Sequence, residues 1–341
     1  MISRQAIWLT LASAAGLSTA MVAVAQPTPP TGKIPSGPTG VTPTVQILPV
    51  SLKVDQVAAT VNGEKILVGD VKRLLDPQPY PVTLTEEQKK QMRQAALDVL
   101  IEEMLLRQYL AKNCKEVTKA EFDKEVEVLN SELKKLTKTL DMYLRENRQT
   151  QEQLSRDIVA HIQWRSLLAR FCPDDKAKAY YDANKLFFDK VFVQASHIMI
   201  ELDSKATKAD RDKAEQTLRV LRQQILSGKM KFEDAVVQYS QCPTKKNKER
   251  PGDIGKFPYK LVVAPEISRA AFALKKGDLS DVVQSPRGLH LLLITDRTAG
   301  EPSTFESVKD AVRQVWAQEE ELYSRILSDQ QKNGQIKRDL P

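Results

Sequence analysis

The organisation of this chain follows from one stretch, Gly252-Asp253-Ile254-Gly255-Lys256-Phe257. A polar helix end with a cysteine, Tyr239-Ser240-Gln241-Cys242-Pro243, precedes it, and a basic loop joins the two. Two apolar strands flank them along the chain, Ala195-Ser196-His197-Ile198-Met199-Ile200 and Gly288-Leu289-His290-Leu291-Leu292-Leu293, and each strand holds one histidine. The stretch alone is a loop. Whether it forms part of a functional site depends on whether the two histidine strands lie beside it.

The residues around this stretch are predicted to form an α+β unit over 191–297. Alternate positions from residue 191 to 200 share one face of a strand, among them Val193, Ala195 and His197. Residues 252–257 are expected to form a turn. We expect helices over 208–227, 232–239 and 265–273, and two last strands over 280–284 and 289–295.

The preceding region, residues 53–190, is predicted to be a hairpin followed by amphipathic helices. Asn62-Gly63 between two apolar runs is typical of a two-residue hairpin turn, because both residues tolerate positive φ. Three helices start at capping boxes, at Thr85, Thr118 and Thr150, each with Gln or Glu three residues later. Apolar stripes follow these boxes, the second one running through Leu136, and a shorter helix is expected over 175–188.

The last region, residues 298–341, is predicted to hold one amphipathic helix capped by Ser303, with a frayed polar tail after Asn333. The apolar face of this helix needs a partner, and the N-terminal helices lack one. We therefore expect it to pack back on residues 53–190, so that the α+β unit is inserted in, or appended to, a helical domain.

Composition and charge narrow the classes of partner. The 341 residues include 51 Lys and Arg against 44 Asp and Glu, a net charge of +7. This charge favours acidic partners, but no basic patch interleaved with aromatic residues predicts nucleic acid as a target. Lysines alternate with glutamates, as on solvated helix faces. A chain of this length is expected to hold two or three units.

The first residues are typical of a processed export signal. Arg4 precedes an apolar run, and Ala23-Val24-Ala25 is a small-x-small cleavage site, so residues 1–25 are predicted to be a signal peptide. An uncleaved anchor is the alternative. Residues 26–52 contain seven prolines among Gly, Thr and Ser and are predicted to be a disordered linker. No cysteine follows the apolar run for lipid attachment, so we expect an exported protein without a stable membrane anchor, in the periplasm rather than outside the cell.

Several residues could carry chemistry. If the strands of His197 and His290 are neighbours, opposed side chains lie ~5 Å apart at Cβ, close enough for a hydrogen-bonded imidazole pair. Taken singly, each histidine is more often a core residue than a catalytic one, and Cys242 has a structural or disulfide role as its alternative. His161 is expected to be structural. The three histidines are scattered, so neither a metal nor a cofactor is predicted.

The cysteines leave two alternatives open. The chain has three, Cys114, Cys172 and Cys242. In an oxidising compartment an odd number leaves one thiol unpaired if the other two form a bridge. Cys114 and Cys172 both fall at expected helix ends, so either they are bridged or all three thiols are free.

The motifs together resemble a known family. The histidine strands, Tyr239-Ser240-x-Cys242-Pro243 and the Gly252–Phe257 turn occur with Ala270-Ala271-Phe272-Ala273-Leu274-x-x-Gly277-x-Leu279-Ser280 in an order that closely resembles the parvulin-type peptidyl-prolyl isomerases. This likeness covers residues 191–297. The flanking parts look like the chaperone region of SurA- and PrsA-type exported foldases, on the basis of Val61-Asn62-Gly63-Glu64, Ala96-Leu97-Asp98-x-Leu100-Ile101-x-Glu103-x-Leu105-Leu106 and Ala179-Tyr180-Tyr181-Asp182-x-Asn184.

The resemblance implies roles for particular residues. His197 and His290 would be paired histidines at the floor of the site, and Cys242 would be the polar group nearest the substrate carbonyl. The remaining roles are pocket roles: Ile254, Val263 and Ile267 would line a proline pocket that Phe257 supports, and Ser285 would stand where the family usually has Thr. The chain departs from the family where Ile267 and Val263 replace bulky Phe and Met, and where Arg287 replaces an aromatic residue.

The resemblance also implies a function. We expect an exported prolyl isomerase and folding chaperone that acts on X–Pro bonds of unfolded or newly translocated proteins. The sequence leaves open whether the protein forms a homodimer. The alternative is a catalytically weak holdase that uses the parvulin-like domain as a peptide platform. A thiol redox protein is disfavoured because the chain lacks a Cys-x-x-Cys motif. The chaperone reading further predicts an apolar groove in the helical unit.

Overall fold

The computed structural model describes residues 54–75, 85–147, 149–203 and 205–340. The chain divides into two compact units: unit 1 comprises residues 1–177 and 313–341, and unit 2 comprises residues 178–312. The expected signal peptide and linker lie outside the described residues, and the domain limits at 190 and 298 stay predictions. Within the described ranges, no helix combines the length and the apolar composition needed to cross a membrane.

Unit 1 begins with the expected hairpin. Strand β1 (Val57–Val61) pairs antiparallel with β2 (Glu64–Leu67). Asn62 and Gly63 take φ values of 50° and 88°, which is the left-handed pair that this turn requires. The prediction from Asn62-Gly63 is therefore confirmed.

A third strand completes this small sheet, and it corrects the expectation of a frayed tail. Strand β7 (Ile336–Arg338) pairs antiparallel with β1, so the order is β2-β1-β7. Two further backbone bonds hold it, from the Asn62 amide to the Gln335 carbonyl and from the Asp339 amide to the Ala58 carbonyl, each within 2.9 Å. The polar sequence of the tail does not predict this pairing, because the strand is stabilised by backbone hydrogen bonds to the open edge of β1 rather than by apolar side chains.

The helices of unit 1 start where the capping boxes predict. Thr85, Thr118 and Thr150 each accept a bond from the backbone of the third helical residue, whose side chain returns the bond. Leu136, expected on a buried stripe, is instead exposed just past the end of its helix. The helices that lie wholly in this part of unit 1 are α2 (Val68–Leu75), α3 (Glu86–Asn113), α4 (Lys119–Lys135), α5 (Leu140–Glu146) and α6 (Gln151–Phe171).

The last helix is broken in two, contrary to expectation. Helix α12 (Phe305–Glu319) and helix α13 (Leu322–Asn333) are separated at Glu321, which takes a φ of 51°. Thr304 rather than Ser303 lies at the start of α12, where its hydroxyl accepts from the Ser307 amide at 3.3 Å. Within unit 1, α13 packs against α3, and the Tyr323 ring meets the Trp164 ring edge-on at 6.4 Å.

The connection into unit 2 is also broken where one helix was expected over 175–188. Helix α7 (Asp174–Ala183) ends before Asn184, and a single turn, α8 (Lys185–Phe188), follows. The Asn184 side chain donates to the Tyr180 carbonyl at 2.8 Å, so this amide satisfies a helix-end acceptor and stops α7.

Unit 2 is an α+β domain built on one antiparallel sheet of order β4-β3-β6-β5. Its strands are β3 (Phe192–Glu201), β4 (Asp253–Pro258), β5 (Val283–Ser285) and β6 (Gly288–Thr298). A turn was expected over 252–257, but residues 253–258 form a strand. They pair along the open edge of β3, because backbone bonding there outweighs the weak strand preference of a segment with Gly255 at its centre. Strand β5 starts at Val283 rather than at the expected residue 280, and before it Leu279 makes an isolated bridge to Leu293.

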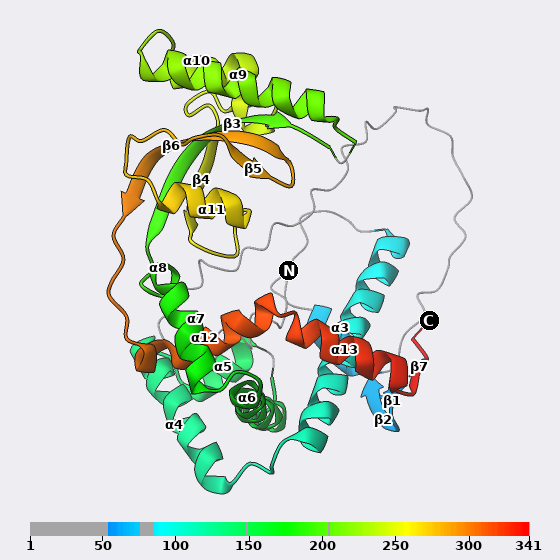
Figure 1. Cartoon of the computed structure of the whole chain (residues 1–341). Helices are drawn as coiled ribbons and strands as arrows, with labels where there is room; N and C mark the ends of the chain where they lie inside the picture. Colours follow the sequence, from blue (N-terminus) through cyan, green and yellow to red (C-terminus); the bar gives the residue numbers. More distant parts are fainter. Residues whose placement is uncertain (1–53, 76–84, 148, 204, 341) are drawn as a thin grey trace, which may run out of the picture. The chain divides into compact units, whose positions relative to one another are not determined.

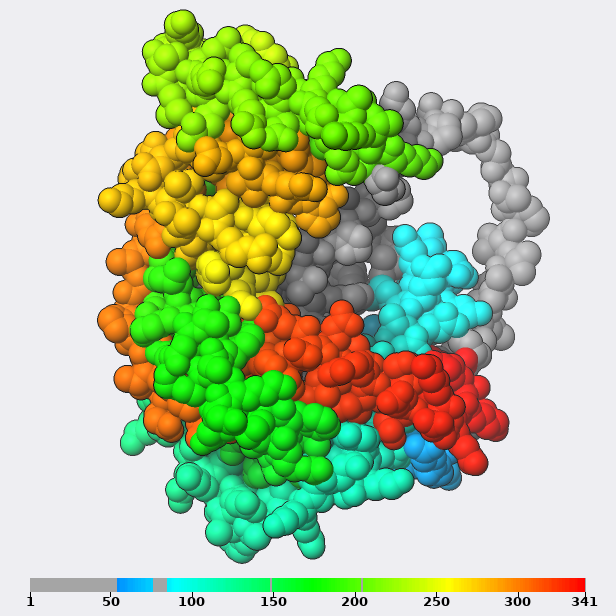
Figure 2. Space-filling view, viewed as in Figure 1, coloured from blue at the N-terminus to red at the C-terminus, as the bar shows by residue number. Residues whose placement is uncertain are grey.

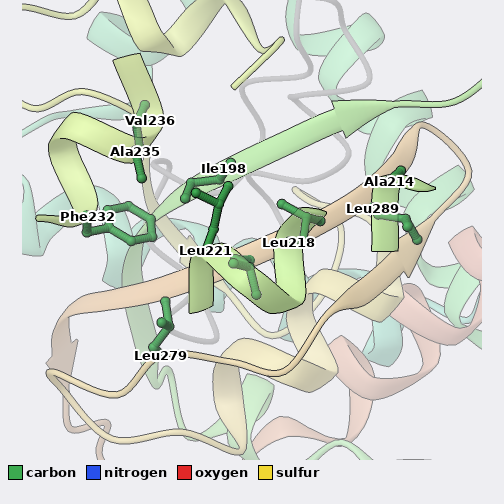
Figure 3. Close-up of a cluster of buried hydrophobic side chains, with 10 residues drawn as sticks. Ile198, Ala214, Leu218, Leu221, Phe232, Ala235, Val236, Leu279 and Leu289 are labelled. Atoms are coloured by element: carbon green, nitrogen blue, oxygen red, sulfur yellow. The ribbon is translucent and has the colours of Figure 1, made fainter. Parts of the chain in front are cut away.

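Helices cover both faces of this sheet (Figure 1). Helix α9 (Lys208–Leu226) and helix α10 (Phe232–Tyr239) pack on one face. Figure 3 shows side chains of this layer turned toward one another, with Ile198 beside Phe232 and Leu221, and Leu289 beside Ala214. Helix α11 (Pro265–Phe272) packs on the other face, which also carries the histidines, and a short 3₁₀ helix, η3 (Pro243–Lys246), follows α10.

Candidate active site

Two buried histidines meet on the α11 face of the sheet. His197 on β3 pairs with Leu292, and His290 on β6 pairs with Met199, so the two lie diagonally across neighbouring strands. Their Nδ1 atoms are 3.4 Å apart and their ring centroids 5.4 Å apart. The expected neighbourhood of the two strands is confirmed. The histidines are not directly opposed, because the register offsets them by two residues, but their long side chains still meet.

Ser285 extends this pair. Its Oγ lies 2.7 Å from His290 Nε2, and it also accepts the Arg287 backbone N–H at 3.1 Å. Both contacts follow from the tight connection between β5 and β6, in which Gly288 takes a φ of 139° and pairs with Ser285. The hydroxyl therefore has a defined place at one end of a chain of three side chains.

Both imidazoles are neutral at ordinary pH. Burial, then the neighbouring His290 and the charge of Arg287, lower the pKa of His197 to about 4. Burial, then the charge of Arg287, lower the pKa of His290 to about 4. A cation would lose its hydration in this site, so the neutral form is favoured.

The pair can share one proton in two ways. If His290 Nδ1–H donates to His197 Nδ1, then His290 Nε2 accepts from the Ser285 hydroxyl and His197 Nε2 carries a proton. In the other arrangement His197 Nδ1–H donates, and His197 Nε2 is a bare acceptor. His197 Nε2 is buried and has no hydrogen-bond partner among the described residues. The site therefore holds one polar atom whose donor or acceptor character depends on the proton between the rings.

The cysteine loop is fastened to the strand that carries His197. The Ser240 hydroxyl accepts from the Met199 amide at 3.1 Å and from the Cys242 amide at 3.4 Å, and the Gln241 amide donates to the Met199 carbonyl at 2.8 Å. Cys242 is 6% exposed. No role was predicted for Ser240 from the sequence. Its place at the end of an amphipathic helix, two residues before a cysteine, is the feature that could have indicated it.

Gly252 allows a close backbone approach on the other side of β3. Its carbonyl accepts the His197 amide at 2.9 Å, and a Cβ at this position would lie 2.7 Å from the His197 carbonyl oxygen. Its φ is +79°, which side chains rarely adopt. The first glycine of the Gly-Asp-x-Gly motif is therefore needed for the backbone contact with His197.

The apolar residues expected to line the pocket lie in one cluster. Phe257 and Ile267 are buried in it, and Ile254 and Val263 are partly buried against it. Leu292, which pairs with His197, belongs to the same cluster. The structure thus brings strand β4, helix α11 and the histidine face of the sheet together.

Comparison with known proteins assigns the family. Residues 197–296 match the family of the PPIC-type PPIASE domain, or rotamase, and residues 47–168 match the SurA-like N-terminal domain. The peptidyl-prolyl cis-trans isomerase Pin1 of Malus domestica is 38% identical over 113 residues, which are 29% of this chain and 90% of that protein. This chain belongs to the parvulin-type peptidyl-prolyl cis-trans isomerases.

Longer relatives extend the likeness beyond the parvulin domain. The foldase protein PrsA of Caldanaerobacter subterraneus is 27% identical over 275 residues, covering 75% of this chain and 78% of that protein. Among solved structures, PrsA from Bacillus anthracis is 24% identical and superposes with a TM-score of 0.36. The matched part covers 69% of this chain and 96% of the PrsA chain. The two family matches, over 197–296 and 47–168, show that this parvulin combines an isomerase domain with a SurA-like N-terminal domain.

The other candidate residues of this parvulin lie elsewhere. His161 is buried in unit 1, with Nε2 3.5 Å from Glu125 Oε1, and Arg165 approaches the same carboxylate at 3.0 Å. Cys114, Cys172 and Cys242 are all free thiols, so no bridge joins the first two. Within the ranges given above, no group of three His, Cys, Asp or Glu residues is arranged to hold a metal ion.

The helical unit contains a cleft whose walls combine charged side chains with the apolar Ile66, Leu100, Met104 and Ala160. The cleft has a volume of about 280 Å³. Its lining includes Glu64, Asp70, Glu103, Arg107, Arg156 and Asp157. Charged residues are the majority of the lining, so this cleft is not the expected apolar groove, which stays a prediction.

Proposed function

We propose that this isomerase is exported and catalyses cis-trans isomerisation of X–Pro bonds in unfolded or newly translocated polypeptides. The supporting observation is the buried, neutral histidine pair with Ser285, on the sheet face that also holds the apolar cluster of Phe257 and Ile267. The reaction is inferred from the family, and these residues are proposed to form the site at which it takes place.

The reaction requires little chemistry from the protein. Rotation about an X–Pro bond crosses a barrier of about 18–20 kcal/mol because amide resonance is lost, but no bond is broken. An apolar pocket that holds the proline ring and a few fixed dipoles that favour the twisted amide are sufficient. A fixed, uncharged histidine pair supplies such dipoles without requiring a hydrated cation in the site.

We assign roles accordingly. Ile254, Val263 and Ile267 hold the proline ring, and Phe257 supports them from beneath. Cys242 faces the substrate carbonyl as the polar group of the site. The smaller Val263 and Ile267 make the pocket shallower than bulky Met and Phe would, so we expect a modest turnover.

We also propose a wider role as a folding factor in the cell envelope, with the periplasm as its compartment. The SurA-like match over 47–168 and the PrsA relatives support a chaperone part that binds unfolded exported chains. We further propose that residues 191–297 form the isomerase domain, inserted between a helical domain at 53–190 and the returning segment 298–341, which holds α12 and α13. The division of the chain at 177 and 313 supports this arrangement.

The test is the cis-trans exchange rate of a Leu-Pro peptide, measured by NMR with and without the full chain. Uncatalysed exchange takes tens to hundreds of seconds, so acceleration is plain. We expect acceleration that falls at least tenfold in Cys242→Ala and His290→Ala. Cys114→Ala, which removes a thiol from unit 1, is the matched control and should leave the rate unchanged.

Either of two results would count against the proposal. If the wild-type chain does not accelerate exchange, the parvulin domain serves as a peptide platform and the function is that of a holdase. If exchange is accelerated equally by wild type and both variants, the site lies elsewhere in the domain.

A further inference from the structure

The loop between β4 and α11 exposes two apolar side chains. Leu261 is 46% exposed and Val262 is 56% exposed, and they are adjacent in sequence. Figure 2 shows the segment around β4 and α11, coloured yellow, at the surface of the visible face. Val263, the next residue, is partly buried against the cluster proposed to hold the proline.

The backbone of this loop is strained at the same place. Leu261 takes a φ of +74°, and among the five described non-glycine residues with positive φ it is the one with a large apolar side chain. A left-handed conformation costs roughly 1–2 kcal/mol for a residue with a Cβ. Glycine or asparagine would adopt this φ with little strain and would expose no large apolar surface. Within the free protein, then, the leucine is only about half buried and keeps a strained backbone.

The loop is nevertheless held at both ends. The Tyr259 ring meets the Phe272 ring edge-on at 5.1 Å. Lys260 Nζ donates to the Tyr180 hydroxyl at 3.2 Å and lies 4.9 Å from the centre of that ring. Val263 and Ala264 pack on the cluster at the other end. Residues 261 and 262 are thus presented to solvent by an anchored loop, which lowers the entropy cost of binding a partner.

We infer that Leu261 and Val262 form an apolar rim that contacts an apolar side chain adjacent to the proline of a bound polypeptide. This inference rests on the proposed function, because it takes Val263, Ile254 and Ile267 as the proline pocket. The rim continues directly from that pocket: residue 262 precedes Val263, and the loop joins β4, which carries Ile254, to α11, which carries Ile267. A chain whose proline occupies the pocket would therefore lay its neighbouring residue on the rim.

The expected effect is a preference of the enzyme for one class of neighbour. An apolar residue beside the proline would cover part of Leu261 and Val262, whereas a polar residue of similar size would lose hydration there. Pocket contacts of one or two methylene groups discriminate roughly 10-fold or more when fully enclosed. For a half-open rim we expect roughly a 3- to 10-fold preference in kcat/KM for Leu over Gln next to proline.

The experiment uses the full chain and two pairs of peptides, Leu-Pro against Gln-Pro and Pro-Leu against Pro-Gln in the same framework. Exchange rates by NMR give kcat/KM, and chemical-shift titration gives Kd. Leu261→Asn keeps a residue that tolerates the left-handed backbone, and Val262→Thr keeps the shape of the side chain. Val237→Thr is the matched control, because Val237 is also 56% exposed but lies on α10, which packs on the opposite face of the sheet.

We expect one peptide pair to show the preference in wild type and in Val237→Thr, and both rim variants to reduce it toward 1. Leu261→Asn should not lower the thermal midpoint of unfolding, because it relieves backbone strain. A lower midpoint with an unchanged Leu-to-Gln ratio would overturn the inference and make the loop structural.

Failure of the proposed function has a different signature. If wild type binds the peptides without accelerating exchange, the isomerase proposal fails, yet a Leu preference in Kd that Leu261→Asn removes still supports the rim. The absence of any Leu preference in both Kd and kcat/KM overturns the rim alone. The rim inference would also be overturned if the chemical shifts of residues 261 and 262 changed with protein concentration rather than with added peptide. That result would mean that a second copy of the chain covers the rim.

Discussion

At the scale of single residues, His197 and His290 couple the site to pH. Both have pKa values lowered to about 4, whereas a histidine in the unfolded chain has a pKa near 6.5. Between these values the unfolded chain binds protons that the folded chain does not, so the free energy of unfolding falls as pH drops from 6.5 to 4 and is constant above. We expect a loss of up to about 3 kcal/mol for each histidine.

This prediction is checked by hydrogen exchange of the β3 and β6 amides at pH values between 7.5 and 4.5, after correction for the intrinsic rate. Protection should decrease toward low pH in wild type and decrease less in His290→Gln. Isomerase activity should stay flat from pH 8 to about 5. A rise in protection on acidification would mean that the pair is charged in the folded state.

Ser285 offers a second test at this scale. Its hydroxyl meets His290 Nε2 at 2.7 Å in a buried position, so Ser285→Ala leaves a ring nitrogen without its partner. We expect a loss of about 1–2 kcal/mol in stability and a several-fold lower kcat/KM, with Ser285→Thr restoring both. Nitrogen NMR of the His290 ring should show a changed tautomer in the alanine variant alone. Ser227→Ala, at an exposed helix end, is the control.

The glycines of the Gly-Asp-x-Gly motif give a matched pair. Gly252 and Gly255 have φ values of +79° and +80°, but only at Gly252 would a Cβ meet other atoms, 2.7 Å from the His197 carbonyl. Gly255→Ala should therefore cost only the left-handed strain, about 1 kcal/mol. Gly252→Ala should cost clearly more and displace His197. Equal thermal midpoints for the two variants would contradict this account.

At the scale of elements, strand β7 shields the edge of β1. The Asn62 amide donates to the Gln335 carbonyl at 2.8 Å, so a chain ending at residue 334 loses this acceptor. We expect at least tenfold faster hydrogen exchange at Asn62 in the truncated chain. The Gly69 amide, which donates to Val54 in the same unit, is the internal control and should not change. Unchanged exchange at Asn62 would show that the strand contributes little.

Elements with local signals could be predicted from the sequence, and elements made by distant pairing could not. The boxes at Thr85, Thr118 and Thr150 and the turn at Asn62 depend on neighbouring residues only. Strands β4 and β7 form because a distant strand has an open edge, which no local pattern records. The family resemblance allowed the two histidine strands to be expected side by side, but the two-residue offset between His197 and His290 depends on the strand register, which no local pattern records.

At the scale of the whole molecule, unit 2 is closed by its own bonds. Asp189 accepts both the backbone N–H and the hydroxyl of Ser303 at 2.7 Å, which joins the segment before β3 to the segment after β6. We expect residues 178–312 to fold when excised and to keep the isomerase rate of the full chain. Asp189→Ala should lower the thermal midpoint of the excised unit, while Asp182→Ala, an exposed acidic residue nearby in sequence, should not. An unfolded excised unit would contradict this view.

The pairing of β7 with β1 also orders events during synthesis. Residues 178–312 are contiguous, so unit 2 can fold as soon as they have left the ribosome or the membrane channel. The first sheet must wait, because its β1 edge is completed only by residues 336–338, almost 280 positions later by the spacing of the paired Ala59 and Arg338. We therefore expect the isomerase unit to mature before the unit that surrounds it in sequence, and to be present, already active, while the rest of its own chain is still folding.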